Sequence, residues 1–344
     1  MLALSIDPEV RRKVRPLAEL AARVDHGPLG VTIEPRELHL ALNAFNRARL
    51  QPCLPSDDWE ADLPVMRAAE LIEARFVEEE RAQTTAQLRS VPRTAMDFVE
   101  WFVSLKERGP GQYDPFFNYI AQEASRSEIR YFIKQEYCGE IGFDDLIALT
   151  QVRLPERAKQ ELARNFWDEQ GRGEPEDIHE PLYVAMAHEL GVKDTPDNEL
   201  LWETLAVANL LTALACNRRY TWQSLGALSV IELTSPTRAS RIAEGLERVG
   251  LSDKGCRYFR LHTVIDVEHW NAWLAEVIIP LVSETPELAV PLAEGALLRL
   301  NAGARLIKRY RAELDLEARL SASAGAPDAA TQVGKGSRIH ADRK

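Results

Sequence analysis

Three polar residues able to bind protons or metals stand close together late in the chain. The stretch LHTVIDVEHW, residues 261–270, carries His262, Asp266 and His269 at positions i, i+4 and i+7. An α-helix turns about 100° per residue, so these positions fall within about 60° of one another on one face. Two imidazoles and a carboxylate on one stripe can converge on a metal such as iron. Taken alone, they could equally form a buried His–Asp hydrogen-bond pair that shapes the core.

A second stretch, NFWDEQGRGEPEDIHEPLY at residues 165–183, offers Glu169, Glu176 and His179. Glu176 and His179 form a Glu-x-x-His pair, the i, i+3 unit that carboxylate-bridged diiron bundles use. Asp266 and His269 have the same spacing. Glu176 stands in an acidic run, so its carboxylate could instead be solvated.

A third stretch, GALSVIELTSP at residues 226–236, places Glu232 among residues typical of a core. Burying a carboxylate is costly unless it is paired or bound to a metal. Arg238 is the alternative partner for Glu232. The three stretches together supply three histidines and three or four carboxylates, a donor set that suits two non-haem irons.

The composition is that of a soluble globular protein, because 45% of the 344 residues are hydrophobic and 28% are charged. A net charge of −11 would repel a phosphate backbone, so we expect no nucleic-acid partner. We also expect no membrane partner and no signal peptide, because no apolar run approaches about 20 residues and no basic region precedes an apolar stretch at the N-terminus. The four cysteines are far apart without a CxxC motif, which favours a reduced, cytoplasmic protein.

Helical periodicity dominates the chain, and alternating strand patterns are scarce. The fold class that follows is all-α: a bundle of about seven core helices with an N-terminal helical extension. We expect the extension over residues 1–92, the bundle over 93–320, and a polar, disordered tail over 321–344. The expected helices cover 8–24, 36–49, 64–88, 95–107, 115–124, 126–138, 141–151, 155–170, 177–190, 197–215, 220–234, 237–249, 254–283 and 287–316, with Pro280 bending or ending the penultimate one.

The motifs WDEQGRGEPEDIH, SVIELT with its Glu232, and His262-x-x-x-Asp266-x-x-His269 resemble those of the haem-oxygenase-like diiron oxidases and oxygenases, an iron-containing redox enzyme family. Three separated motifs agree with that family in order and approximate spacing, and the resemblance covers about residues 95–316. A ferritin-like bundle is a less suitable alternative, because a second Glu-x-x-His is missing.

The resemblance implies a haem-oxygenase-like fold that binds two iron ions and no haem. It implies Glu169, His179, Glu232, His262, Asp266 and His269 as iron ligands. Glu176 is an alternative or additional ligand, and Glu136 a further carboxylate near the cluster.

The resemblance also implies reaction of two Fe(II) ions with O2 and oxidation of a small-molecule substrate, with electrons from an external donor. We expect N-oxygenation of a small amine to a hydroxylamine or nitro product, in secondary metabolism. The alternatives are an oxidase that cleaves carbon–carbon bonds in, or desaturates, an amino or fatty acid, and a non-catalytic helical binding protein with a polar core. The extension could pack across a homodimer.

Overall fold

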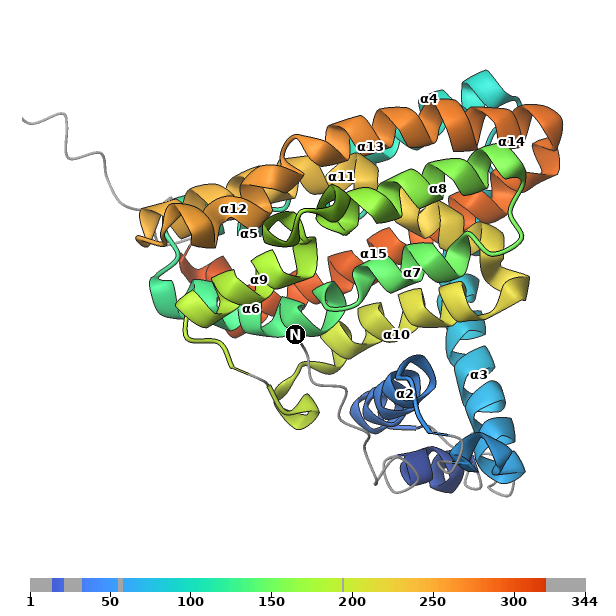
Figure 1. Ribbon diagram of the computed structural model, residues 1–344, viewed down its shortest axis with the longest axis horizontal. Helices are drawn as coiled ribbons and strands as arrows, with labels where there is room; N and C mark the ends of the chain where they lie inside the picture. Colours follow the sequence, from blue (N-terminus) through green and yellow to red (C-terminus); the bar gives the residue numbers. More distant parts are fainter. Residues whose placement is uncertain (1–13, 22–32, 55–57, 194, 320–344) are drawn as a thin grey trace, which may run out of the picture.

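The computed structural model describes residues 14–21, 33–54, 58–193 and 195–319, and within these ranges the chain forms helices and no strand (Figure 1). The expected all-α class is therefore confirmed. The main helices are α2 (Pro35–Leu50), α3 (Leu63–Leu88), α4 (Ala95–Arg108), α5 (Pro115–Gln122), α6 (Arg126–Glu140), α7 (Phe143–Thr150), α8 (Glu156–Glu169), α9 (His179–Glu189), α10 (Trp202–Cys216), α11 (Thr221–Arg248), α12 (Asp253–His262), α13 (Ile265–Trp273), α14 (Ile279–Glu284) and α15 (Ala289–Glu313).

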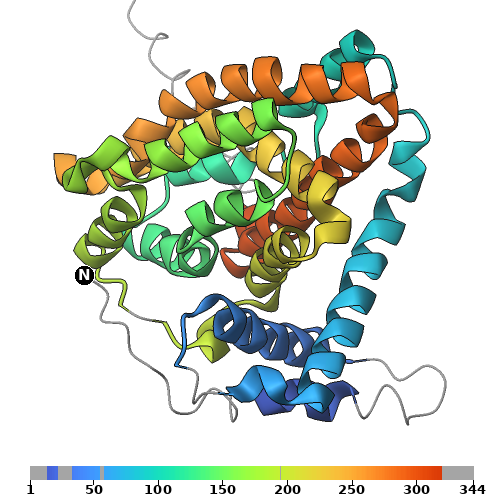
Figure 2. The same ribbon diagram turned by 45° about the vertical axis from the view of Figure 1, so that its right-hand side comes forward.

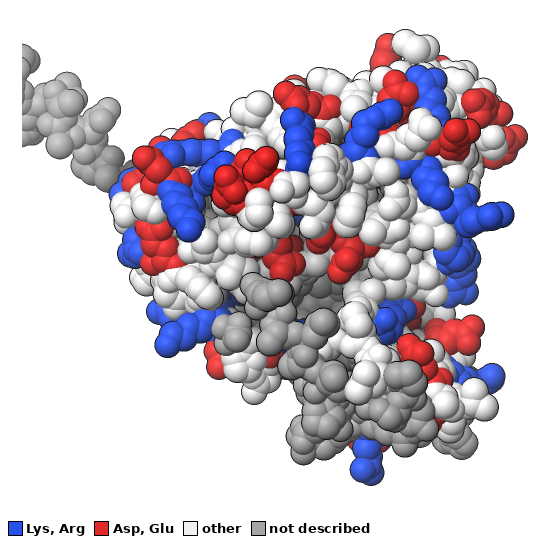
Figure 3. Space-filling model, viewed as in Figure 1, with Lys and Arg blue, Asp and Glu red and all other residues white. Residues whose placement is uncertain are grey.

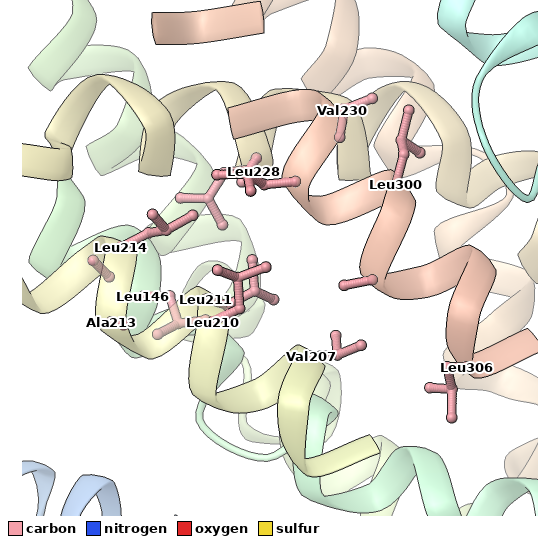
Figure 4. Packing of buried hydrophobic residues seen from close by; sticks show 14 of the residues in the cluster. Leu146, Val207, Leu210, Leu211, Ala213, Leu214, Leu228, Val230, Leu300 and Leu306 are labelled. Atoms are coloured by element: carbon pink, nitrogen blue, oxygen red, sulfur yellow. The ribbon is translucent and has the colours of Figure 1, made fainter. Parts of the chain in front are cut away.

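The centre of the bundle is built by α10, α11 and α15. Figure 4 shows leucine and valine side chains of these three helices filling the space between them. α11 and α15 approach to backbone contact. A Cβ atom added at Gly226 would lie 1.9 Å from the carbonyl oxygen of Leu292, and one at Gly295 would lie 1.8 Å from that of Gln223. Only glycine permits this approach, so these two residues fix how closely the helices pack.

The N-terminal helices α2 and α3 lie against one side of this bundle (Figure 2). α2 is joined to α10 by the buried amides of Asn46 and Asn209, with Nδ2 to Oδ1 at 2.8 Å, and by His39, whose carbonyl accepts a bond from Asn209. α3 is joined to α15 by ion pairs such as Arg81–Glu294 at 3.0 Å. The domain boundary at residue 92 stays a prediction. Residues 14–21 of the expected helix 8–24 are helical, whereas the rest of that helix and the expected tail, 321–344, lie outside the described residues.

Two expected helices, 220–234 and 237–249, are one continuous helix, so that expectation was wrong. α11 runs through Pro236, although proline removes one backbone donor and usually ends a helix. α11 is buried along most of its length between neighbouring helices, and packing of this kind supplies more stability than one lost hydrogen bond removes.

The expected helix 254–283 is broken instead, which is the second correction. α12 ends at His262 and α13 begins at Ile265. Thr263, Val264 and Ile265 are three successive β-branched residues, which are poor helix formers. The hydroxyl of Thr263 also donates to the carbonyl of Arg260 at 2.7 Å. α13 continues through a π-helical turn, Leu274–Ile278, and Pro280 stands in the first turn of α14.

Basic and acidic side chains are interspersed over the face in Figure 3, with no continuous basic stripe in the described part of it. No described helix is both long and apolar enough to cross a lipid bilayer. All four cysteines carry free thiols.

Candidate metal centre

The structure gathers the six core ligands expected from the sequence into two groups. Glu169, His179 and His262 form one group, here called the first triad, and Glu232, Asp266 and His269 form the second triad. Within each triad the nitrogen and oxygen atoms on offer lie within 4.8 Å of one another. Five helices, α8, α9, α11, α12 and α13, contribute to the two triads, so the site is assembled by the whole bundle.

The first triad is set up by a tight connection between α8 and α9. Glu169 is the last residue of α8 and His179 the first of α9, and Oε2 of the former lies 2.6 Å from Nδ1 of the latter. Between them Gly171 adopts φ +65°, and a Cβ there would lie 2.6 Å from the backbone carbon of Asp177. The left-handed glycine turn therefore lets the chain reverse so that the two ligands face one another.

Glu176 does not belong to either triad, which corrects the expected Glu-x-x-His pair. It lies in the 3-10 turn Pro175–Asp177 and its side chain is exposed. Because α9 begins only at His179, the i, i+3 geometry of a helix does not apply to Glu176 and His179.

The second triad combines two residues of α13 with Glu232 from α11. The Nδ1 atom of His269 lies 3.3 Å from Oε2 of Glu232 and 3.9 Å from Oδ1 of Asp266. The outer oxygens of the carboxylates have other partners: Asn165 donates to Glu232 at 3.0 Å, and the hydroxyl of Ser235 donates to Asp266. These bonds hold the carboxylates in place. Arg238, the alternative partner expected for Glu232, instead lies near Glu136.

The residues of one sequence motif are divided between the two triads. His262, Asp266 and His269 were expected on one helical stripe, but His262 ends α12 while the other two lie on α13. His262 groups with Glu169 and His179, whereas Asp266 and His269 group with Glu232. One sequence motif therefore serves two adjacent triads.

Hydrogen bonds fix which ring nitrogen of two histidines faces its triad. Nδ1 of His262 lies 2.7 Å from the carbonyl oxygen of Tyr258, which can only accept, so Nδ1 carries the proton and Nε2 is free. In His269 the roles are reversed. Its Nε2 lies 3.1 Å from Oδ2 of Asp168, which leaves Nδ1 for the second triad. Asp168 is itself held by Arg172 at 2.6 and 3.1 Å.

The buried polar atoms of the triads fit a bound metal ion. Nδ1 of His179 and Nδ1 of His269 are buried and have no hydrogen bond, although each faces a carboxylate. A buried polar atom without a partner is costly, and a metal ion between imidazole and carboxylate would satisfy both. Three imidazoles and three carboxylates are nitrogen and oxygen donors of the kind that non-haem iron accepts.

The electrostatics of the site reflect the crowding of its carboxylates. Against the effect of burial, the charges of Glu232 and Glu169 raise the pKa of His269 to about 10, so a metal ion bound there would displace a proton from this ring. Burial, together with the charge of Glu232, raises the pKa of Glu169 to about 7. Burial and the neighbouring carboxylates also raise the pKa of Asp266. Burial lowers the pKa of His179 to about 4, so this ring is neutral and able to ligate. Crowded carboxylates in a dry site disfavour their own ionisation, and a bound cation removes that penalty.

A cavity of about 120 Å³ adjoins both triads and is lined by Glu169, Glu232, His262 and Asp266. Its volume corresponds to room for about ten water-sized groups. Glu136 is on its wall, as expected of a carboxylate near the cluster, but it accepts a bond from the hydroxyl of Tyr310 at 2.6 Å and is in neither triad.

Sequence reasoning missed two carboxylates of this region, Asp168 and Glu140. Glu140 lines the cavity, accepts a bond from the hydroxyl of Tyr258 at 2.6 Å, and has its pKa raised by burial. Glu140 stands one helical turn after Glu136, and Asp168 directly precedes Glu169. The i, i+4 spacing on α6 was the signal for Glu140. No pattern in the sequence distinguishes Asp168 from a solvated residue.

Comparison with known proteins adds one finding. The family model described as "iron-containing redox enzyme" matches residues 130–304, just over half of the chain, and this span includes all six residues of the triads. No curated protein matches the chain.

Proposed function

The chain belongs to the iron-containing redox enzyme family and has its haem-oxygenase-like all-α fold, and from this premise we propose that it is a non-haem diiron, O2-dependent oxygenase. The observation that carries the proposal is the division of six donors, five of them buried and His262 partly buried, into two triads beside one cavity. Each triad would hold one iron ion, which supplies the reactivity toward O2 when it is bound. Haem is not part of the proposal, because the three carboxylates of the triads are donors typical of non-haem iron.

The protein's own residues would bind and orient the substrate and exclude water. Aromatic and aliphatic side chains, Phe132, Phe143 and Ile242 among them, line the cavity. A reacting group bound there meets few competing waters and is held in one orientation, which is the main way a protein lowers the barrier of such a reaction.

We propose that the reaction is N-oxygenation of a small amine to a hydroxylamine or nitro product, in secondary metabolism. Glu140 supports this, because it lines the cavity near His262 and a carboxylate attracts an amine in its protonated form. In the first step one oxygen atom of O2 is inserted into an N–H bond to give N–OH, and the other leaves as water. Two electrons and two protons from an external donor balance that step.

A second candidate, cleavage or desaturation of an amino or fatty acid, is favoured by a different observation. Arg238 and Arg299 also line the cavity, and guanidinium groups bind carboxylates. Product mass separates the two reactions, because N-oxygenation adds oxygen whereas cleavage removes a carbon fragment and desaturation removes two hydrogens.

The deciding experiment is anaerobic loading with Fe(II), followed by iron quantitation and exposure to O2. We expect two irons per chain in the wild type and fewer in His269→Ala. The matched control is His188→Ala, because His188 is an exposed histidine of α9 outside both triads. Wild-type protein that retains no iron would overturn the proposal and favour a non-catalytic binding protein. Iron-loaded protein that consumes no O2 with any amine or acid would overturn the oxygenase.

A further inference from the structure

Two arginines on the cavity wall are the least compensated charges of the bundle. Arg238 comes from α11 and Arg299 from α15, and both line the cavity beside the triads. The Nε atoms of both are buried without a hydrogen-bond partner. Among the residues that the structure describes, no carboxylate lies within ion-pair distance of Arg299. Burial and the charge of Arg238 lower the pKa of Arg299 to about 10, so it remains a cation at neutral pH.

Other partly buried arginines of the chain have close partners. Arg49 lies 2.6 Å from Glu73, and Arg305 lies 3.0 Å from Glu80. Buried charges are normally paired because an unpaired one loses its hydration without compensation. Arg299 departs from this pattern, and it lines a cavity that a ligand can enter. An unpaired arginine in such a position is typical of an anion-binding site.

The nearby carboxylates leave Arg299 without a contact partner. Glu136 lies 3.8 Å from Arg238 and also accepts the hydroxyl of Tyr310. Glu140 accepts the hydroxyl of Tyr258 at the part of the cavity where His262 lies, and it acts on Arg299 only through its charge. Among the described carboxylates, Glu136 alone lies within ion-pair distance of this pair of arginines, and it does so at Arg238.

The arginines are also set back from the triads. Glu232 and Arg238 are six residues apart on α11, roughly 9 Å along the helix axis. Apolar side chains form much of the remaining wall, including Val207 and Leu211 from α10 and Leu306 from α15 (Figure 4). A ligand that spans this cavity would have a charged end, a short apolar body and a reacting end.

We propose that Arg238 and Arg299 bind the carboxylate of the substrate and so direct its other end to the triads. This inference rests on the proposed function, because it concerns the substrate of that reaction. It adds the chemical class of the substrate, a small carboxylic acid. An amine that is oxygenated at this site would then carry a carboxylate several bonds from its nitrogen.

The test measures binding to metal-free protein, so that a carboxylate cannot be held by iron. Calorimetric titrations use hexanoate and 6-aminohexanoate, with hexanamide and hexylamine as matched compounds that lack the carboxylate, in chloride-free buffer. We expect both carboxylates to bind at least tenfold more tightly than hexanamide and hexylamine. Arg299→Gln should weaken carboxylate binding about tenfold or more, since hydrogen bonds between charged groups contribute more than 1.4 kcal/mol. Arg260→Gln, which removes an exposed arginine outside the cavity, is the control and should bind as the wild type does.

A thermal measurement keeps the test valid if a variant folds poorly. Removing an unpaired buried charge should leave the melting temperature of Arg299→Gln unchanged or raise it, and hexanoate should stabilise the wild type but not the variant. Three results would each overturn the proposal. They are equal affinities for hexanoate and hexanamide, a wild-type affinity for hexanoate in Arg299→Gln, and an affinity for chloride as high as that for hexanoate. This titration uses metal-free protein, so its result does not depend on iron loading. Failure of carboxylate binding and failure of iron binding can therefore be distinguished.

Discussion

Oδ2 of Asp168 lies 3.1 Å from Nε2 of His269, and Arg172 holds the same carboxylate from its other side. A histidine that donates one ring N–H to a carboxylate presents its other nitrogen in a fixed orientation and with greater basicity. Asp168 thus orients a residue of the second triad although it belongs to neither triad.

Replacing Asp168 should therefore weaken metal binding at the second triad alone. We expect Asp168→Ala to lower the affinity for one of two irons by about 10- to 100-fold. Competition with a chromophoric Fe(II) chelator measures this. Asp253→Ala, at an aspartate whose side chain is 98% exposed, should behave as the wild type. Two tightly bound irons in Asp168→Ala would contradict the assigned role.

The glycine turn before His179 should be intolerant of any side chain. Gly171→Ala places a Cβ at positive φ and 2.6 Å from the backbone of Asp177, which should cost about 1–3 kcal/mol of unfolding free energy. Chemical denaturation measures the loss, and iron quantitation should show the first triad emptied. Gly139→Ala in α6 is the control, because a Cβ there meets nothing within 4 Å. Equal stability of the two variants would show that the turn can adjust.

Metal binding should stabilise the fold, because the triads join five helices. At an Fe(II) concentration 100 times the dissociation constant, each site adds about 2.7 kcal/mol to the unfolding free energy. Melting curves recorded without oxygen should therefore shift upward by several degrees in the wild type. His262→Ala and His269→Ala should each lose part of the shift. No shift at saturating Fe(II) would mean that the triads do not bind iron.

His39 should make stability depend on pH in a defined window. Burial, with the charge of Arg305, lowers its pKa to about 3 from an ordinary value of 6.5. The unfolded chain therefore takes up this proton below about pH 6.5, whereas the folded protein does not. The contribution of His39 to stability therefore falls as pH decreases through the window from 6.5 to 3, by about 1.4 kcal/mol per unit.

Denaturation at pH 7, 6 and 5 measures that slope. His39→Gln should have a shallower slope than the wild type, because its side chain takes up no proton in this range. His188→Gln, at an exposed position of α9, should keep the wild-type slope. Identical slopes in all three proteins would show that His39 can ionise in the fold.

Much of the candidate site could be predicted from the sequence, because the six residues of the triads are of types that are rarely buried without a purpose. Two features were sufficient to predict one shared metal centre: Glu232 within an apolar helix, and the motif that contains His262, Asp266 and His269. The division into two triads could not be predicted. It coincides with the break after His262, where the β-branched residues Thr263, Val264 and Ile265 oppose a strong hydrophobic pattern. Periodicity alone does not show which of the two prevails.

Other features depend on which segments meet in three dimensions. Glu176 has the right spacing from His179 but lies outside any helix, because Pro175 begins a separate turn. The helix end expected near Pro236 is absent, because packing along α11 outweighs the tendency of proline to end a helix. The sequence does not show which residues of other helices lie next to Arg299. It therefore could not predict that Arg299 has no carboxylate within ion-pair distance.

The backbone contact at Gly226 and Gly295 has a consequence for selectivity. α11 carries Glu232 and Arg238, and α15 carries Arg299. Since neither helix can slide or tilt without a clash of main-chain atoms, the gap between the arginines and the triads has a set length. A molecule one methylene too short or too long would lose its contact at one end, so discrimination among homologous chains would come from rigidity and not from added contacts.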